Sequence, residues 1–204
     1  DFFSYYKMIW FLIASLCSII TYALYTYFNN DFKIRKTLYY IPLGVYGLFV
    51  LLSSLFAEHF KVALIGFPDR YEGMFVLLGY VIVTFVTINL VRNKKEIKFV
   101  LGSLIASSSL LGIIGIFQFF GMDFFRSKLG KLMMLPAEYH NLVDKLNFKF
   151  GANEIYASMY NINYVGSYTV MLFCLSLAVF ILVKQRKHRI WAGLFSVLMF
   201  ANWQ

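Results

Sequence analysis

Charge is scarce in this sequence. Charged residues make up 14% of its 204 residues, whereas hydrophobic residues make up 60%. The apolar residues fall into blocks of about 20, the length that a helix needs to cross a roughly 30 Å hydrocarbon core. This composition excludes an ordinary water-soluble domain and indicates an integral membrane protein.

The sequence also lacks the signals of several other protein classes. Its two cysteines, Cys17 and Cys174, both lie inside apolar blocks, so they provide neither a disulfide framework nor the spacing of a metal site. No Walker loop, dinucleotide-binding glycine fingerprint, HExxH or G-x-S-x-G motif is present. No linker divides the chain, and no internal repeat appears. We therefore expect one domain that uses no metal or cofactor and contains no self-sufficient catalytic set.

The apolar blocks predict an all-α, polytopic transmembrane bundle over residues 1–204. Helices satisfy their own backbone hydrogen bonds in lipid, and the blocks are continuously apolar rather than alternating as in an outer-membrane barrel. We expect five full helices and a partial sixth, at residues 8–28, 38–57, 74–91, 99–121, 165–183 and 190–204. Because the last block is too short to span a bilayer and the chain begins with Asp1, we expect an internal piece of a longer protein.

Basic residues mark the short connections between these helices. Residues 29–37, 92–98 and 184–189 contain 11 of the 19 lysines and arginines. Basic connections favour the cytoplasmic side, so these three are predicted to face the cytoplasm. The outer loops are then residues 58–73 and 122–164. The net charge of +9 is explained by this topology and by anionic lipid headgroups, and we expect no nucleic-acid partner.

The outer turn at residues 66–73, G-F-P-D-R-Y-E-G, places three charged residues against the start of an apolar block. Asp69 is a candidate N-cap, and Glu72 falls at the third following position, where a carboxylate suits a helix N-terminus. Arg70 is unfavourable beside the positive end of a helix dipole, so it needs a carboxylate or a bound anion. Two interpretations stay open: a capped helix start with an internal ion pair, and a diphosphate site.

A second candidate site is the sequence N-I-N-Y-V-G-S-Y at residues 161–168, where the long outer loop enters the next helix. Asn161 or Asn163 is expected to cap this helix, and their amides could equally hydrogen-bond sugar hydroxyls.

His59 and His140 are the two histidines that the predicted topology places on the outer side. Each is a candidate general base, although a solvated histidine is the simpler interpretation.

Two further segments are singled out by their patterns. Small residues are frequent in block 99–121, which predicts a central, closely packed helix, with a serine-lined substrate groove as the alternative. Residues 124–133 place apolar side chains on one helical face and basic ones on another. This pattern predicts a short amphipathic helix in the membrane interface, serving as an anchor or as part of a substrate cleft.

With its G-x-P-x-R-x-E-G turn, followed roughly 90 residues later by N-x-N-Y-V-G-S-Y, the chain resembles the O-antigen ligase family. The Tyr-rich form of these motifs is most similar to members from Gram-positive bacteria, and the resemblance spans residues 67–175. It implies a glycosyltransferase class C type fold in the bacterial plasma membrane. It also implies transfer of a glycan from an undecaprenyl diphosphate carrier to a glycan, lipid or protein acceptor, as a ligase or a polymerase, without a metal.

The resemblance implies in addition that arginines hold the diphosphate and that a histidine in a large later outer loop is the base. We expect that histidine to lie outside these residues, so that this part alone is inactive. Arg70 is assigned the diphosphate contact, with Glu72 orienting it. The family's Asn-Pro-Asn form is replaced here by Asn161-Ile162-Asn163. The expected substrate-binding residues are Asp69, Arg70, Glu72, Asn161, Asn163 and Tyr164.

A transporter or flippase for a lipid-linked or anionic solute is the alternative function. Transporters tend to place charged or broken-helix features near the bilayer midplane, often in paired repeats. The blocks here contain almost no charge, and among the prolines only Pro42 lies inside a block. The sequence therefore favours chemistry at the outer face.

Overall fold

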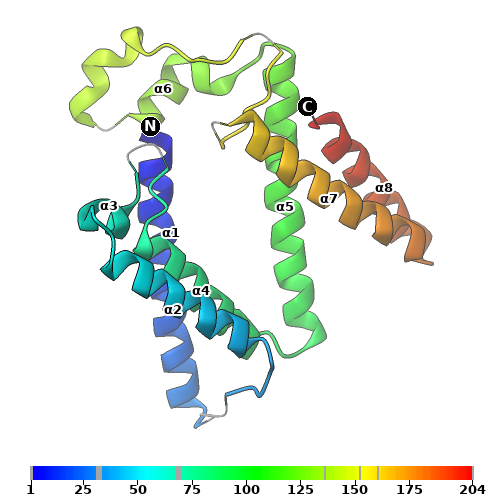
Figure 1. Cartoon of the computed structure of the whole chain (residues 1–204). Coiled ribbons are helices and arrows are strands. Elements are labelled where there is room, and N and C mark those ends of the chain that lie inside the picture. The colour runs from blue at the N-terminus through cyan, green and yellow to red at the C-terminus, as the bar shows by residue number, and fades with distance from the viewer. Residues whose placement is uncertain are drawn as a thin grey trace. The chain divides into compact units, whose positions relative to one another are not determined.

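Every regular element in the described part of the chain is a helix. The computed structural model describes residues 2–30, 34–67, 70–135, 137–151, 153–159 and 161–203. The chain divides into two compact units, residues 1–98 and residues 99–204 (Figure 1). The all-α class predicted from the sequence is thereby confirmed, whereas the single bundle and the glycosyltransferase class C arrangement stay predictions.

The first unit is built around α4. Its elements are α1 (Phe2–Phe28), α2 (Tyr40–Leu55), α3 (Phe60–Ile65) and α4 (Met74–Leu90) (Figure 1). α1 and α2 both pack on α4, and the short α3 contacts α2 and α4. Helices α1 and α4 approach closely at Gly79, where an added Cβ would lie 2.7 Å from the Phe11 ring. The Ser15 hydroxyl donates to the Gly79 carbonyl there, at 3.4 Å. A small residue on α4 therefore permits this close packing.

Asn89, near the C-terminal end of α4, ties three segments of the first unit together. It is fully buried. Its side-chain amide donates to the Tyr40 hydroxyl at 2.7 Å and to the Phe85 carbonyl at 2.8 Å, and its carbonyl oxygen accepts from the Arg35 amide at 3.0 Å. A buried amide with both ends satisfied fixes the connection before α2 against the end of α4.

The second unit contains a helical hairpin and a loop-rich segment. Its elements are most of α5 (Lys94–Phe119), then η1 (Phe124–Arg126), α6 (Lys128–Met134), η2 (Ala137–Lys145), α7 (Ile162–Leu182) and α8 (Arg186–Ala201). α7 and α8 lie side by side as an antiparallel hairpin (Figure 1). The hydroxyls of Ser176 and Ser196 meet between them at 2.7 Å. These serines join the two helices where no water competes.

One stripe of α5 is buried in this unit. The Ser108 hydroxyl lies 2.6 Å from the Tyr168 hydroxyl of α7, and the Asn202 amide donates to the Gly112 carbonyl at 3.0 Å. A Cβ on Gly112 would lie 2.9 Å from Met199 of α8. Packing, rather than a serine-lined groove, therefore accounts for the small residues on this stripe.

The six predicted helices are all present, but they differ in length. Three helices are long and apolar enough to cross a membrane, namely Ser4–Phe28, Lys94–Phe119 and Ile162–Leu182. α2 and α4 have 16 and 17 residues. At 1.5 Å per residue they reach only about 24–26 Å of a roughly 30 Å hydrocarbon core. α2 and α4 are thus shorter than the three helices of span length among the described residues, and the predicted number of membrane spans stays a prediction.

The predicted connection at residues 92–98 is largely helical, because α5 begins at Lys94. Asn93 accepts hydrogen bonds from the amides of Lys95 and Glu96, both at 3.0 Å. Glu96 accepts in return from the amides of Arg92 and Asn93, at 2.6 and 3.0 Å. This reciprocal pattern is a capping box. The predicted connection at residues 184–189 is also partly helical, because α8 begins at Arg186.

Candidate functional site

The turn at residues 66–73, of which residues 68 and 69 lie outside the described part of the chain, has two glycines that meet at its neck. α3 ends at Gly66, whose φ of 97° lies in the left-handed region that glycine adopts without strain. The backbones of Gly66 and Gly73 pack directly on each other. A Cβ on Gly73 would overlap the Gly66 amide nitrogen and the Leu64 carbonyl oxygen, and a Cβ on Gly66 would overlap the Glu72 amide nitrogen. Glycine is thus required at both neck positions of this pinched loop.

Contacts on either side hold the described part of the pinched loop in place. The amides of Arg70 and Tyr71 both donate to the Phe67 carbonyl, each at 3.0 Å. Tyr71 has a φ of 53°, and its ring packs edge-on against Tyr5 of α1 with the centroids 5.4 Å apart. The loop is therefore attached to the start of α1 as well as to α3 and α4.

The pinched loop has two charged residues within the described part of the chain, Arg70 and Glu72. Both Arg70 and Glu72 are exposed. Within the described part of the chain, the Arg70 guanidinium has no hydrogen bond or ion pair, so Glu72 does not pair with it. Asp69 lies outside the described residues. The guanidinium of Arg70 thus offers its planar fork of N–H donors to a ligand, the geometry that suits phosphate and carboxylate groups.

The predicted cap of the next helix is not the one that the structure shows. α4 begins at Met74, and its N-cap is Gly73, which has no side chain to accept a hydrogen bond. Glu72 therefore precedes the helix instead of occupying its third position. The predicted start at residue 74 is confirmed, and only the cap differs. As a result, Glu72 is left in the loop beside Arg70.

The second predicted site has the expected helix cap. Asn161 is the N-cap of α7, and its side-chain oxygen accepts from the Asn163 amide at 2.9 Å. Asn163 and Tyr164 lie in the first turn of α7 and are exposed. The capping role of Asn161 is confirmed. The structure brings these three residues together in the second unit, whereas Arg70 and Glu72 belong to the first unit.

A polar cluster at the end of α5 and in the long connection before α7 was not predicted. We call it the Asp123 cluster; it consists of Gln118, Asp123, Arg126 and Tyr156. The Asp123 carboxylate accepts from Arg126 Nε at 3.1 Å and from the Tyr156 hydroxyl through a short hydrogen bond. Gln118 donates to the Ala157 carbonyl at 3.2 Å and accepts from the Ala157 amide at 2.7 Å. The cluster therefore fixes residues 155–157 against the end of α5.

Aromatic rings enclose the phenol of this cluster. The Tyr156 ring is 1% exposed and stacks on Phe150, with centroids 4.3 Å apart and 15° between the planes. Burial, reinforced by the hydrogen bond to the Asp123 carboxylate, raises the pKa of Tyr156 above its ordinary value. The phenol stays protonated and donates to Asp123. Arg126 also donates to the Phe150 carbonyl at 2.7 Å, which closes the cluster on its outer side.

The predicted amphipathic helix is present but interrupted. η1 and α6 are separated at Ser127, whose hydroxyl accepts from the Gly130 amide at 3.1 Å and so caps α6. Phe124, Leu129 and Met133 are 48%, 61% and 71% exposed. An exposed apolar face next to basic side chains suits the membrane interface. Arg126, however, belongs to the Asp123 cluster and not to a free basic face.

The described residues offer little conventional catalytic chemistry. No group of three or more His, Cys, Asp or Glu side chains is placed to hold a metal ion among them. His59 is exposed just before α3, and the Nε2 of His140 lies 3.1 Å from the Leu135 carbonyl. Neither histidine contacts the pinched loop through a described hydrogen bond. The arrangement can bind an anion and position it, and it shows no assembled acid–base pair.

Some of this site could be found from the sequence, and some could not. The spacing Asp123-x-x-Arg126 after Gly121 is a local turn signal. Tyr156 is 33 positions from Asp123, so no local pattern pairs them.

Comparison of the chain with known protein families, with curated proteins and with solved structures finds no match.

Proposed function

We propose that the chain is part of a membrane glycan ligase or polymerase of the O-antigen ligase type. In this proposal it transfers a glycan from an undecaprenyl diphosphate carrier to an acceptor at the outer face of the bacterial plasma membrane. The basic connections would lie on the cytoplasmic side, which puts the pinched loop outside. The observation that carries the proposal is the exposed Arg70 in a loop whose two neck glycines fix its shape.

The chemistry follows from the charge that develops during transfer. As the bond between the glycan and the carrier diphosphate breaks, negative charge grows on the leaving diphosphate. A guanidinium positioned in advance stabilises that charge without reorganising during the reaction. Arg70 would accordingly act on the leaving group, and the proton transfer would fall to another residue. Asn163 and Tyr164, exposed at the start of α7, would meet sugar hydroxyls in the same proposal.

Polar residues inside the helices support this proposal over transport. Asn89, Ser108 and Ser196 are buried and hydrogen-bonded to neighbouring helices or to their own backbone. Their polar groups are therefore used to hold the helices together. A solute pathway would need such groups to face the solute. We retain a transporter or flippase for a lipid-linked solute as the second candidate only because the exposed Arg70 would serve it equally well.

The two candidates differ in where the donor accumulates when Arg70 is changed. We would introduce Arg70→Lys and Arg70→Gln into the full protein in cells and label carrier-linked glycan on intact spheroplasts with a lectin. If the protein is a transferase, the donor accumulates on the outer leaflet and product glycan falls. Donor retained on the inner leaflet would instead identify a flippase. Arg35→Lys, at an exposed arginine in the connection before α2, is the matched control and should leave both signals unchanged.

A further inference from the structure

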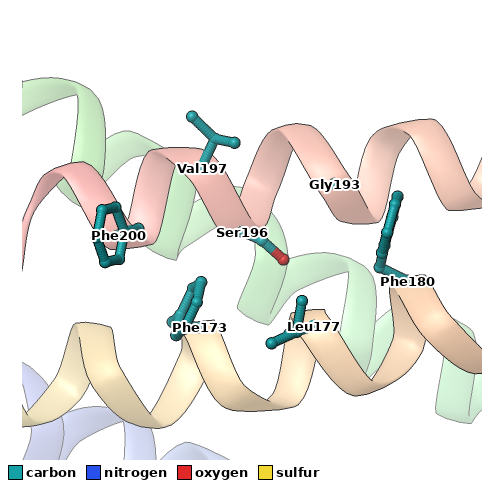
Figure 2. Close-up of a pocket in the computed structure, with 7 residues that line it drawn as sticks. All are labelled: Phe173, Leu177, Phe180, Gly193, Ser196, Val197 and Phe200. Atoms are coloured by element: carbon teal, nitrogen blue, oxygen red, sulfur yellow. The ribbon is translucent and has the colours of Figure 1, made fainter.

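The α7–α8 hairpin carries an apolar groove along its length, with a volume of about 370 Å³. Figure 2 shows the rings of Phe173 and Phe200 near each other at one end, with centroids 5.5 Å apart, and the Phe180 ring beside Gly193 at the other end. A Cβ on Gly193 would lie 3.1 Å from that ring, so the glycine makes room for it. The groove is lined by Phe173, Leu177, Phe180, Gly193, Ser196, Val197 and Phe200.

The groove offers hydrocarbon contact and almost nothing else. Ser196 is the polar residue of its lining, and its hydroxyl is engaged with the Ser176 hydroxyl at 2.7 Å and with the Ala192 carbonyl at 2.9 Å. An occupant therefore gains no hydrogen bond there. Within a bilayer an acyl chain meets these requirements, because it has no polar group to satisfy.

The connection after α7 and the first turn of α8 are strongly basic, with no acidic residue nearby in the sequence. Lys184, Arg186, Lys187 and Arg189 are all exposed, and in the described part of the chain none of their side chains has a hydrogen bond or ion pair. Residues 155–204 contain no Asp or Glu. We call residues 184–189 the basic segment. No carboxylate within residues 155–204 can neutralise its positive charge.

The basic segment and the groove are adjacent. Phe180, at one end of the groove, is four residues from Lys184, and Gly193 is four residues from Arg189. Arg189 and Gly193 are both in α8, where four residues correspond to roughly 6 Å along the axis. A phosphate at the basic segment therefore lies above the end of the groove, where the first carbons of its acyl chain would enter.

We propose that the hairpin binds an anionic glycerophospholipid, with one acyl chain in the groove and the phosphate-bearing headgroup at the basic segment. The acyl chain contact is common to all phospholipids, so selectivity comes from the headgroup charge. This site is independent of the function proposed above, because it uses no residue of the pinched loop. It lies at the end of the hairpin opposite the Asn161 cap.

The test is a site-specific photo-crosslink from the groove in the full protein. p-Benzoylphenylalanine replaces Val197, which lines the groove and is 67% exposed, or Leu194, which is 57% exposed and does not line it. The protein is placed in bilayers of equal parts phosphatidylglycerol and phosphatidylcholine, irradiated, and analysed by mass spectrometry. We expect phosphatidylglycerol adducts at position 197 to exceed phosphatidylcholine adducts roughly threefold or more, with little preference at position 194.

Neutralising the basic segment distinguishes this site from ordinary lipid contact. The variant Lys184→Gln/Arg186→Gln/Lys187→Gln/Arg189→Gln should lower the ratio at position 197 to about one, by removal of the charge attraction. Lys94→Gln/Lys95→Gln/Lys98→Gln, in another basic segment, should not change it. If the fourfold variant does not fold, as judged by circular dichroism and gel filtration, the pair Lys184→Gln/Arg186→Gln should give an intermediate ratio.

Three results would overturn the proposal. The first is an equal yield of the two lipid adducts at position 197 in the unmodified protein. The second is a preference that persists after neutralisation. The third is crosslinking of position 197 to protein instead of lipid, which would show that a second copy or another segment covers the groove.

Discussion

Asp123 should be the residue of the connection between α5 and α7 whose polar contacts contribute most to the stability of that connection. Its side chain is 6% exposed. It accepts from the Phe125 amide at 3.0 Å, from Arg126 Nε at 3.1 Å and from the Tyr156 hydroxyl. Asp123→Asn keeps the size of the side chain but replaces one acceptor oxygen by an NH₂ group, so at least one of these donors loses its partner.

The size of the effect can be worked out from these contacts. If the buried Tyr156 hydroxyl is left without an acceptor, the cost is about 1–3 kcal/mol. Loss of the carboxylate charge weakens the bond to the Phe125 amide by roughly a further 1 kcal/mol. The Arg126 side chain is 42% exposed, so water replaces much of that ion pair and its share is about 0–1 kcal/mol. We expect a total of about 2–5 kcal/mol.

Hydrogen exchange in detergent micelles measures this local stability directly. The amides of residues 118–126 and 155–157 should exchange faster in Asp123→Asn, by the factor that corresponds to the lost free energy. Tyr156→Phe should cost about 1 kcal/mol, and the double variant less than the sum of the two, because they share one bond. Asp144→Asn, at an exposed aspartate of the same loop, is the control. Exchange in Asp123→Asn within about 0.5 kcal/mol of the unmodified protein would refute this reasoning.

Two further predictions concern the pinched loop and the buried phenol. Gly73→Ala forces a Cβ into the backbone of Gly66 and should lower the free energy of unfolding by roughly 1–3 kcal/mol. Trypsin should then cleave after Arg70 faster. Gly102→Ala, with open space around the added Cβ, should change neither the stability nor the cleavage rate. Cleavage of Gly73→Ala at the unmodified rate would contradict the pinched geometry. The raised pKa of Tyr156 means that the folded state holds the phenol proton more tightly than the unfolded chain does. That contribution is complete below about pH 10 and is lost as pH rises above it, so the melting temperature should fall more between pH 9 and 11 in the unmodified protein than in Tyr156→Phe. Equal falls would show that the phenol does not contribute.

The helices could be predicted from the sequence because the length and continuity of an apolar block are local properties. Their ends could be predicted only where a local cap is written in the sequence. The reciprocal bonds of Asn93 and Glu96 are such a case, since the sequence Asn-x-x-Glu carries the pattern of a capping box. The contact between Ser108 and Tyr168 joins residues 60 positions apart, and hydropathy contains no information on it.

The candidate site could likewise be predicted only in part from the sequence. The sequence identified Arg70 as a cation without an obvious partner and Asn161 as a helix cap, because both arguments depend on neighbouring residues. It placed the start of α4 correctly at residue 74 but assigned the cap to Asp69, whereas the N-cap is Gly73, whose backbone packs on Gly66. That contact is a property of the folded loop. The glycines were visible in the motif, and their spacing alone does not show that their backbones touch.

Transfer by the purified full-length protein with Arg70→Lys tests the central claim most directly. The assay would follow product formation from a carrier-linked glycan and an acceptor, in the same lipid and with Arg35→Lys as control. Because lysine keeps the charge but cannot form the two parallel hydrogen bonds of a guanidinium, we predict a fall in the transfer rate of roughly tenfold or more, about 1.4 kcal/mol of transition-state stabilisation. A rate for Arg70→Lys equal to that of the unmodified protein would contradict the assignment of Arg70 to the diphosphate.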